Sequence, residues 1–185
     1  MKIRNGFVSN SSSSSFVVIF DKKPESVEEL QSILYGKSTR VMGYDDRSFS
    51  TIELSKMIFN DITNVDNIIN PNDESSIEKV SDEFDNLFWL YDGGYDDFPD
   101  FFEPDKMSLE ELSKLNKDRY SDLTWEVKEE LINRLAKVET ERFFEKFNDK
   151  FIVLVNYSDN DGSMGCQLEH GDTFRNLNYI RISHH

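Results

Sequence analysis

Two short apolar runs near opposite ends of the chain constrain the fold more than any other feature. Residues 16–20 are Phe-Val-Val-Ile-Phe, and residues 151–155 are Phe-Ile-Val-Leu-Val. Runs of this length and composition predict buried β-strands. Two further strands are expected near residues 164–168 and 179–183. We therefore expect the N-terminal strand to pair with the C-terminal group in a small, mainly antiparallel sheet, which brings the two chain ends together.

The middle of the chain, about residues 24–147, is predicted to be largely helical. Ser26 with Glu29 forms a capping box, in which two side chains satisfy N–H groups at the start of a helix. The same spacing recurs in Ser50 with Glu53 and in Ser108 with Glu111. Other segments are expected to be irregular (residues 60–72) or helical (residues 76–90 and 122–147). The pattern predicts one α+β domain over residues 1–185, with the helical middle packed against the sheet.

The composition limits the partners and the compartment. Thirty-six acidic residues against twenty-one basic ones leave a formal charge of -15, which argues against direct nucleic-acid binding. A basic protein partner fits this charge, and a merely solvated surface explains it equally well. Cys166 is the single cysteine, so an internal disulfide is ruled out. No stretch approaches the roughly 18 apolar residues of a membrane span. We expect a cytoplasmic protein without membrane segments.

A polar motif precedes the first strand. Asn10 is followed by five serines, Ser11 to Ser15. Small hydroxyls beside an asparagine can line a pocket and donate hydrogen bonds to a phosphate or a carboxylate. The candidate ligand-binding residues here are Asn10, Ser11, Ser12 and Ser13. A tightly packed structural turn is an equally good interpretation.

A second polar motif closes the chain, and all three histidines lie in the last sixteen residues. Imidazoles near carboxylates are what a metal site or an acid–base site requires. The candidate ligand-binding residues are Asp159, Asp161, Glu169 and His170, and the candidate metal ligands are His170, His184 and Asp161. A divalent metal such as Zn, Mn or Fe fits these donors. Ordinary surface histidines and a frayed terminus are the alternative. An EF-hand is excluded, because Tyr157 and Leu168 would fall at its first and twelfth ligand positions.

A third segment, residues 88–103, interleaves aromatic rings with acidic side chains. Rings and carboxylates on a segment broken by glycine and proline suit a loop that grips a basic, partly apolar surface. The candidate partner-binding residues are Trp89, Tyr91, Tyr95, Asp96, Asp97 and Phe98. The alternative is that most of the rings fold inward and complete the core.

The two ends of the chain resemble those of a group of poorly characterised proteins of bacteriophages and prokaryotes. The resemblance is carried by Arg-x-Gly-Phe-Val-Ser-Asn-Ser-Ser-Ser-Ser-Ser-Phe at residues 4–16 and by the C-terminal Asp-Asn-Asp-Gly, Leu-Glu-His-Gly and Ser-His-His elements. Residues 21–150 carry none. The resemblance implies a phage context, and hence the host cell cytoplasm, but no activity.

Two functions follow from these features. The first is a small acidic phage-type accessory protein that binds and modulates or inhibits a host protein, including one that normally binds nucleic acid. The second is an enzyme or a small-ligand or metal-binding protein, with one site built from the N-terminal Asn/Ser motif and the C-terminal Asp/Glu/His motif. The sequence assigns no catalytic residue.

Overall fold

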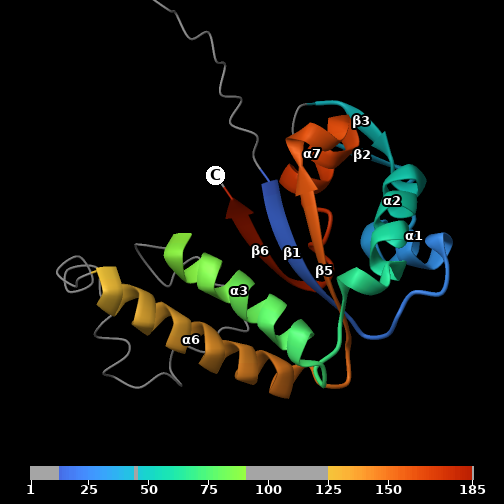
Figure 1. The fold of residues 1–185 in the computed structure, drawn as a ribbon. Coiled ribbons are helices and arrows are strands. Elements are labelled where there is room, and N and C mark those ends of the chain that lie inside the picture. Colours follow the sequence, from blue (N-terminus) through green and yellow to red (C-terminus); the bar gives the residue numbers. More distant parts are fainter. Residues whose placement is uncertain (1–12, 44–45, 91–124, 185) are drawn as a thin grey trace, which may run out of the picture.

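The structure, a computed structural model, describes residues 13–43, 46–90 and 125–184, and of residues 88–90, 125–131 and 184 the backbone alone. Its elements are β1 (Ser13–Phe20), α1 (Val27–Tyr35), β2 (Arg40–Met42), β3 (Ser48–Ser50), α2 (Thr51–Thr63), β4 (Ile68–Ile69), α3 (Glu74–Leu90), α6 (Trp125–Lys146), β5 (Phe151–Ser158), α7 (Gly162–His170) and β6 (Asn178–His184). Two single-turn 3-10 helices, η1 (Val65–Asn67) and η4 (Asp159–Asp161), precede β4 and α7. The expected α+β class is confirmed (Figure 1).

The main sheet has the strand order β4-β5-β1-β6, and each neighbouring pair is antiparallel. The N-terminal strand β1 lies between two C-terminal strands, as the sequence predicts. Ser13 at the start of β1 pairs with Ser158 of β5 on one side and with His184 of β6 on the other. The beginning of β1 therefore lies beside the end of β5, from which the C-terminal polar motif continues.

The central part of this sheet is buried on both faces, which explains the continuous apolar runs at residues 16–20 of β1 and 151–155 of β5. Successive side chains of a strand point to opposite faces. Phe16 and Val18 of β1 pack with α1 and α2, whereas Val17 and Ile19 pack with α3 and α6. Figure 1 shows α3 and α6 covering one face of the sheet, with α1, α2 and α7 on the other. No helix in the described part of the chain is long and apolar enough to cross a membrane.

Local sequence signals explain how α1 begins and ends. The hydroxyl of Ser26 accepts a hydrogen bond from the backbone N–H of Glu29, as the capping box predicts. Gly36 ends the helix with a φ of 61°, a conformation that glycine adopts without a steric penalty. The second predicted capping box is wrong, because Ser50 makes no side-chain cap and instead pairs with Arg40 in a small β2–β3 sheet. The third, at Ser108, lies outside the described residues.

The strand predicted at residues 164–168 is also wrong, since these residues lie within α7. Met164 and Leu168 are four residues apart and both contact the core, a spacing that suits one face of a helix. Residues 60–72, which were expected to be irregular, contain more regular secondary structure. The helix α2 continues to Thr63, and η1 and β4 follow it.

Candidate functional site

The polar motif after β5 begins with a tightly capped turn. The Ser158 hydroxyl accepts a hydrogen bond from the N–H of Asn160, and the Asp161 carboxylate accepts one from the N–H of Ser158. Gly162 follows with a φ of 76°, which lets the chain turn from η4 into α7. Asp159 thus lies at a fixed position immediately before a helix.

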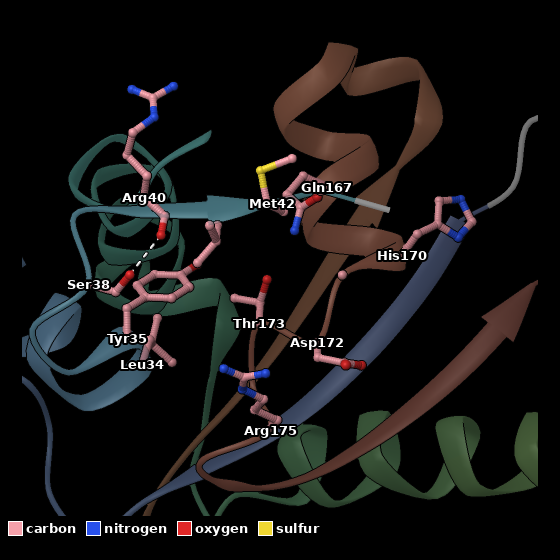
Figure 2. A pocket seen from close by; sticks show the side chains of 13 residues that line it. Leu34, Tyr35, Ser38, Arg40, Met42, Gln167, His170, Asp172, Thr173 and Arg175 are labelled. Atoms are coloured by element: carbon pink, nitrogen blue, oxygen red, sulfur yellow. Dashed lines mark hydrogen bonds between the residues drawn. The ribbon is translucent and has the colours of Figure 1, made fainter. Parts of the chain in front are cut away.

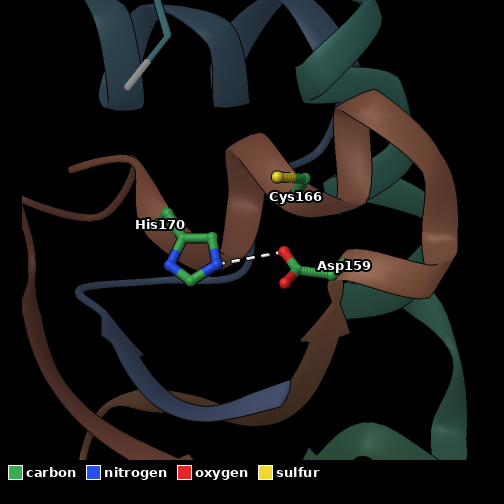
Figure 3. Close-up of side chains that lie close together, drawn as sticks. All are labelled: Asp159, Cys166 and His170. Atoms are coloured by element: carbon green, nitrogen blue, oxygen red, sulfur yellow. Dashed lines mark hydrogen bonds and ion pairs between the residues drawn. The ribbon is translucent and has the colours of Figure 1, made fainter. Parts of the chain in front are cut away.

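Three side chains with metal-binding atoms converge next to this turn. A carboxylate oxygen of Asp159, the sulfur of Cys166 and a ring nitrogen of His170 all lie within 4.8 Å of one another. Nε2 of His170 lies 3.0 Å from Oδ1 of Asp159. Cys166 and His170 are one helical turn apart on α7, so they project from the same face toward Asp159 (Figure 3). We call these three residues the Asp–Cys–His cluster.

A fourth side chain, the carboxylate of Glu169, reaches the cluster from the interior. Its Oε2 lies 3.5 Å from Nε2 of His170, and the side chain is 0% exposed. Within the described part of the chain, neither of its oxygens has a hydrogen-bond partner. Burying a carboxylate without hydrogen bonds or a counter-charge costs on the order of several kcal/mol in free energy. A positive charge close to His170 would offset this cost.

Close packing holds α7 against the capped turn. A Cβ atom on Gly165 would lie 2.3 Å from Cβ of Asp161 and 2.8 Å from the carbonyl oxygen of Ser158. Real Cβ atoms do not approach other atoms this closely, so only glycine allows the helix to lie here. This approach brings Cys166, the next residue, within reach of Asp159.

A cavity of about 440 Å³ opens beside the cluster. Its walls come from the end of α1, from β2 and from the end of α7, and His170 belongs to both the cavity wall and the Asp–Cys–His cluster (Figure 2). Gln167 also lines it and is 5% exposed. A volume of this size is within the roughly 300–1,000 Å³ of small-molecule sites.

Burial changes the titration of two tyrosines near the site. Burial raises the pKa of Tyr35, on the cavity wall, to about 12, and the neighbouring Thr173 hydroxyl partly offsets this effect. Burial also raises the pKa of Tyr157 well above its usual value, and the adjacent Asp61 raises it further. Tyr35 and Tyr157 therefore remain protonated hydrogen-bond donors at neutral pH.

The structure brings together three of the C-terminal residues that the sequence indicates, namely Asp159, Glu169 and His170. Asp161 is used in the capped turn, where its Oδ2 accepts from the Ser158 N–H. His184 lies in β6 by its backbone. Of the three predicted metal ligands, His170 alone belongs to the Asp–Cys–His cluster among the described side chains.

Of the four N-terminal candidates, three lie outside the described residues and one lies in β1. Asn10, Ser11 and Ser12 are outside the described residues, and Ser13 is a partly buried residue of β1. The two following serines are buried, and the Ser15 hydroxyl donates to Oδ1 of Asn156 at 2.6 Å. Ser14 and Ser15 thus act as strand residues that pair with β5 and β6.

Most of the partner-binding candidates lie outside the residues that the structure describes. Trp89 belongs to α3 by its backbone. The remaining five, Tyr91, Tyr95, Asp96, Asp97 and Phe98, lie outside the described residues.

Cys166 is the site residue that sequence reasoning missed. The Cys-x-x-x-His spacing from Cys166 to His170 was the available signal, because it places both side chains on one face of a helix. The expectation of a strand at residues 164–168 hid this signal.

Comparisons with protein-family models, with curated proteins and with solved structures find no match to this chain.

Proposed function

We propose that this protein binds a transition-metal ion, with Zn²⁺ as the best match, through Asp159, Cys166 and His170. The observation that carries the proposal is the convergence of their donor atoms within 4.8 Å of one another. In a tetrahedral zinc site with bonds of about 2.0–2.3 Å, neighbouring ligand atoms lie roughly 3.3–3.8 Å apart. Small side-chain rotations therefore suffice to place the three donors around one ion.

Glu169 supplies the second argument. Its buried carboxylate approaches the same ring nitrogen of His170 that meets Asp159. Two carboxylates at such short range repel one another, and a divalent cation removes this repulsion and favours the thiolate form of a coordinated cysteine. A protonated His170 alone would offset only one of these charges. Glu169 is therefore the fourth ligand, or it compensates the charge of the bound ion.

The arrangement differs from that of a cysteine hydrolase. In such an enzyme the histidine uses one ring nitrogen for the thiol and the other for the carboxylate. Here Nε2 of His170 meets both Asp159 and Glu169. Donors that converge on one point favour an ion over a relay of protons.

The donor set also favours particular metals. A thiolate with an imidazole selects Zn²⁺ and related soft or borderline ions over Mg²⁺ and Ca²⁺, which prefer oxygen ligands. Asp159 is 38% exposed and His170 is 24% exposed, so an ion can enter from solvent on their side.

The test is a titration of the full chain with Co²⁺ and Zn²⁺ after treatment with a chelator. One equivalent of Co²⁺ is expected to produce the near-ultraviolet charge-transfer absorption of a cobalt–thiolate bond, and Zn²⁺ should remove this absorption by competition. Cys166→Ser should abolish the absorption. Both Cys166→Ser and His170→Ala should weaken metal binding by at least about 100-fold, since each removes a direct ligand.

The matched control is Ser163→Ala, which changes an exposed side chain on the same helix. It should bind Co²⁺ like the unmodified protein. Absence of stoichiometric binding, or binding that survives unchanged in Cys166→Ser and His170→Ala, contradicts the proposal.

A role as a phage-type accessory protein that binds a host protein stays a prediction. Its support is the charge of -15, together with the aromatic–acidic segment of residues 88–103. A pull-down from bacterial lysate tests it, and the absence of any specific partner at low salt counts against it.

A further inference from the structure

We infer that the cavity beside the Asp–Cys–His cluster binds a small molecule that carries an oxyanion, either a carboxylate or a phosphate monoester, together with a hydroxyl or amino donor. The cavity lies between α1, β2 and the end of α7 (Figure 2). Two polar groups lie on its wall. Gln167 needs a hydrogen-bond donor and Arg175 needs an anion, and one molecule with a hydroxyl or amino group and an oxyanion supplies both.

Gln167 requires a hydrogen-bond donor. Its side chain is 5% exposed, and Oε1 has no hydrogen-bond partner among the described residues. Its amide group lies close to the backbone of Gly43 and Gly171, where an added Cβ atom would clash with Oε1 and Nε2 respectively. A buried carbonyl that stays unpaired is costly. A hydroxyl or amino group of a ligand would satisfy it.

Arg175 requires an anion. Its side chain is exposed at the cavity, and in the described part of the chain nothing forms a hydrogen bond or an ion pair with its guanidinium. A guanidinium binds carboxylates and phosphates with two parallel hydrogen bonds. Figure 2 shows Thr173 between Arg175 and Gln167, so that its hydroxyl lies between the two groups.

The charge of the cavity wall differs from that of the protein as a whole. The chain carries a formal charge of -15, yet the described cavity wall carries Arg40 and Arg175 against a single acidic residue, Asp172. The guanidinium of Arg40 is already bonded to the hydroxyl and carbonyl oxygens of Ser48. Arg175 is therefore the group that holds the oxyanion.

His170 connects the cavity with the metal site, because it belongs to both. A ligand in the cavity would lie next to the ion bound by the cluster. This adjacency rests on the proposed metal function. The binding of the oxyanion by Arg175, and of the ligand's hydroxyl or amino group by Gln167, does not.

Calorimetric titration of the zinc-loaded full chain tests the inference. The probes are L-malate as the carboxylate, glycerol 3-phosphate as the phosphate monoester, inorganic phosphate, and glycerol as the uncharged comparator. Malate or glycerol 3-phosphate should bind and glycerol should not; the probe that binds identifies the oxyanion.

Arg175→Gln should weaken this binding by about 10- to 100-fold, as expected for hydrogen bonds to a charged group. Gln167→Met should weaken the binding of malate or glycerol 3-phosphate more than that of inorganic phosphate.

The matched control is Arg134→Gln, which removes the same charge from an exposed position on α6, across the sheet. Its affinity should equal that of the unmodified protein. If neither malate nor glycerol 3-phosphate binds, or if Arg134→Gln weakens binding as much as Arg175→Gln, the inference is wrong. Failure of the Co²⁺ titration would overturn the metal function alone, and repeating the probe titrations on chelator-treated protein would still test the cavity.

Discussion

The hydroxyl of Tyr157, near the end of β5, donates a hydrogen bond to Oδ2 of Asp61 on α2 at a distance of 3.1 Å. Asp61 is half-buried, and this burial raises the pKa of its carboxyl group. The Tyr157 bond lowers the pKa in part, and the negative charge of Asp161 raises it. The bond therefore ties α2 to the base of the turn that carries Asp159.

The first prediction concerns the pH dependence of Asp61. The folded protein holds the Asp61 proton to a higher pH than the unfolded chain, which releases it near the ordinary value of 3.8. The free energy of unfolding therefore loses the contribution of this group as the pH rises from that value through the raised pKa. Asp61→Asn keeps an acceptor for Tyr157 and removes the titration. Urea unfolding at a series of pH values should show that the free energy of unfolding of the variant, relative to that of the unmodified protein, increases between about pH 4 and pH 7.

The control for this experiment is Asp66→Asn, an exposed position in η1. Asp66→Asn should not reproduce the pH-dependent gain of Asp61→Asn. A stability difference for Asp61→Asn that does not change with pH would show that burial does not raise the Asp61 pKa.

The second prediction concerns Glu169 and the metal. In the presence of a chelator, Glu169→Gln should be at least as stable as the unmodified protein, because it removes a buried carboxylate that has no hydrogen-bond partner among the described residues. With Zn²⁺ at about 100 times its dissociation constant, the unmodified protein should gain about 2.7 kcal/mol, and the variant should gain less. Thermal unfolding in both conditions measures this. A gain from zinc in the variant that equals or exceeds that of the unmodified protein would contradict the assigned role of Glu169.

The third prediction concerns the contact between α7 and the capped turn. Gly165→Ala would place a methyl group against the carbonyl oxygen of Ser158 and the side chain of Asp161. We expect a loss of about 1–3 kcal/mol in the free energy of unfolding, which is typical of overpacking, and weaker Co²⁺ binding because Cys166 moves away from Asp159. Ser163→Ala, two residues earlier and exposed, should change neither quantity. Unchanged stability and metal affinity in Gly165→Ala would show that the helix tolerates a shift at this contact.

The fourth prediction concerns the core between the sheet and α2. Leu54 is 0% exposed and packs in the same cluster as Val18 and Val153. Leu54→Ala should lower the free energy of unfolding by about 2–5 kcal/mol, the range for leucine truncations in protein cores. Val65, which is 76% exposed, is the comparator, and Val65→Ala should stay within about 0.5 kcal/mol of the unmodified protein. Equal effects of the two changes in chemical denaturation would contradict the packing of α2 on this face.

The sequence predicts the central strands well, because each contains a run of five apolar residues. The runs at residues 16–20 and 151–155 have to be covered on both faces, and both are strands of the central pair. The β2–β3 pair was missed, since strands of three residues with exposed polar side chains carry no period that distinguishes them from a loop.

The candidate site was predicted in part. Asp159, Glu169 and His170 were found because acidic residues and histidine gather near the C-terminus, but their geometry depends on the conformation of residues 162–170. On a strand, Cys166 and His170 would be roughly 13 Å apart along the chain, whereas on a helix they rise by only about 6 Å and share one face. The short apolar pattern of Met164 and Leu168 fits both conformations. The contacts of α7 with the rest of the protein, among them the close approach of Gly165 to Ser158 and Asp161, depend on the tertiary structure and cannot be read from the sequence.

The position of β1 at the centre of the sheet also determines when the protein can fold during its synthesis. Ser15 and its hydrogen-bond partner Asn156 are 141 residues apart in the chain. At about 5–20 residues per second, a ribosome makes β1 roughly 7–28 s before it makes the partner strand β5, and β6 follows later still. In the described sheet β1 pairs only with these two strands. A nascent chain therefore carries an apolar strand with two open edges while residues 21–150 are made, and it depends on its own helices or on a chaperone to cover that strand until β5 and β6 have been made.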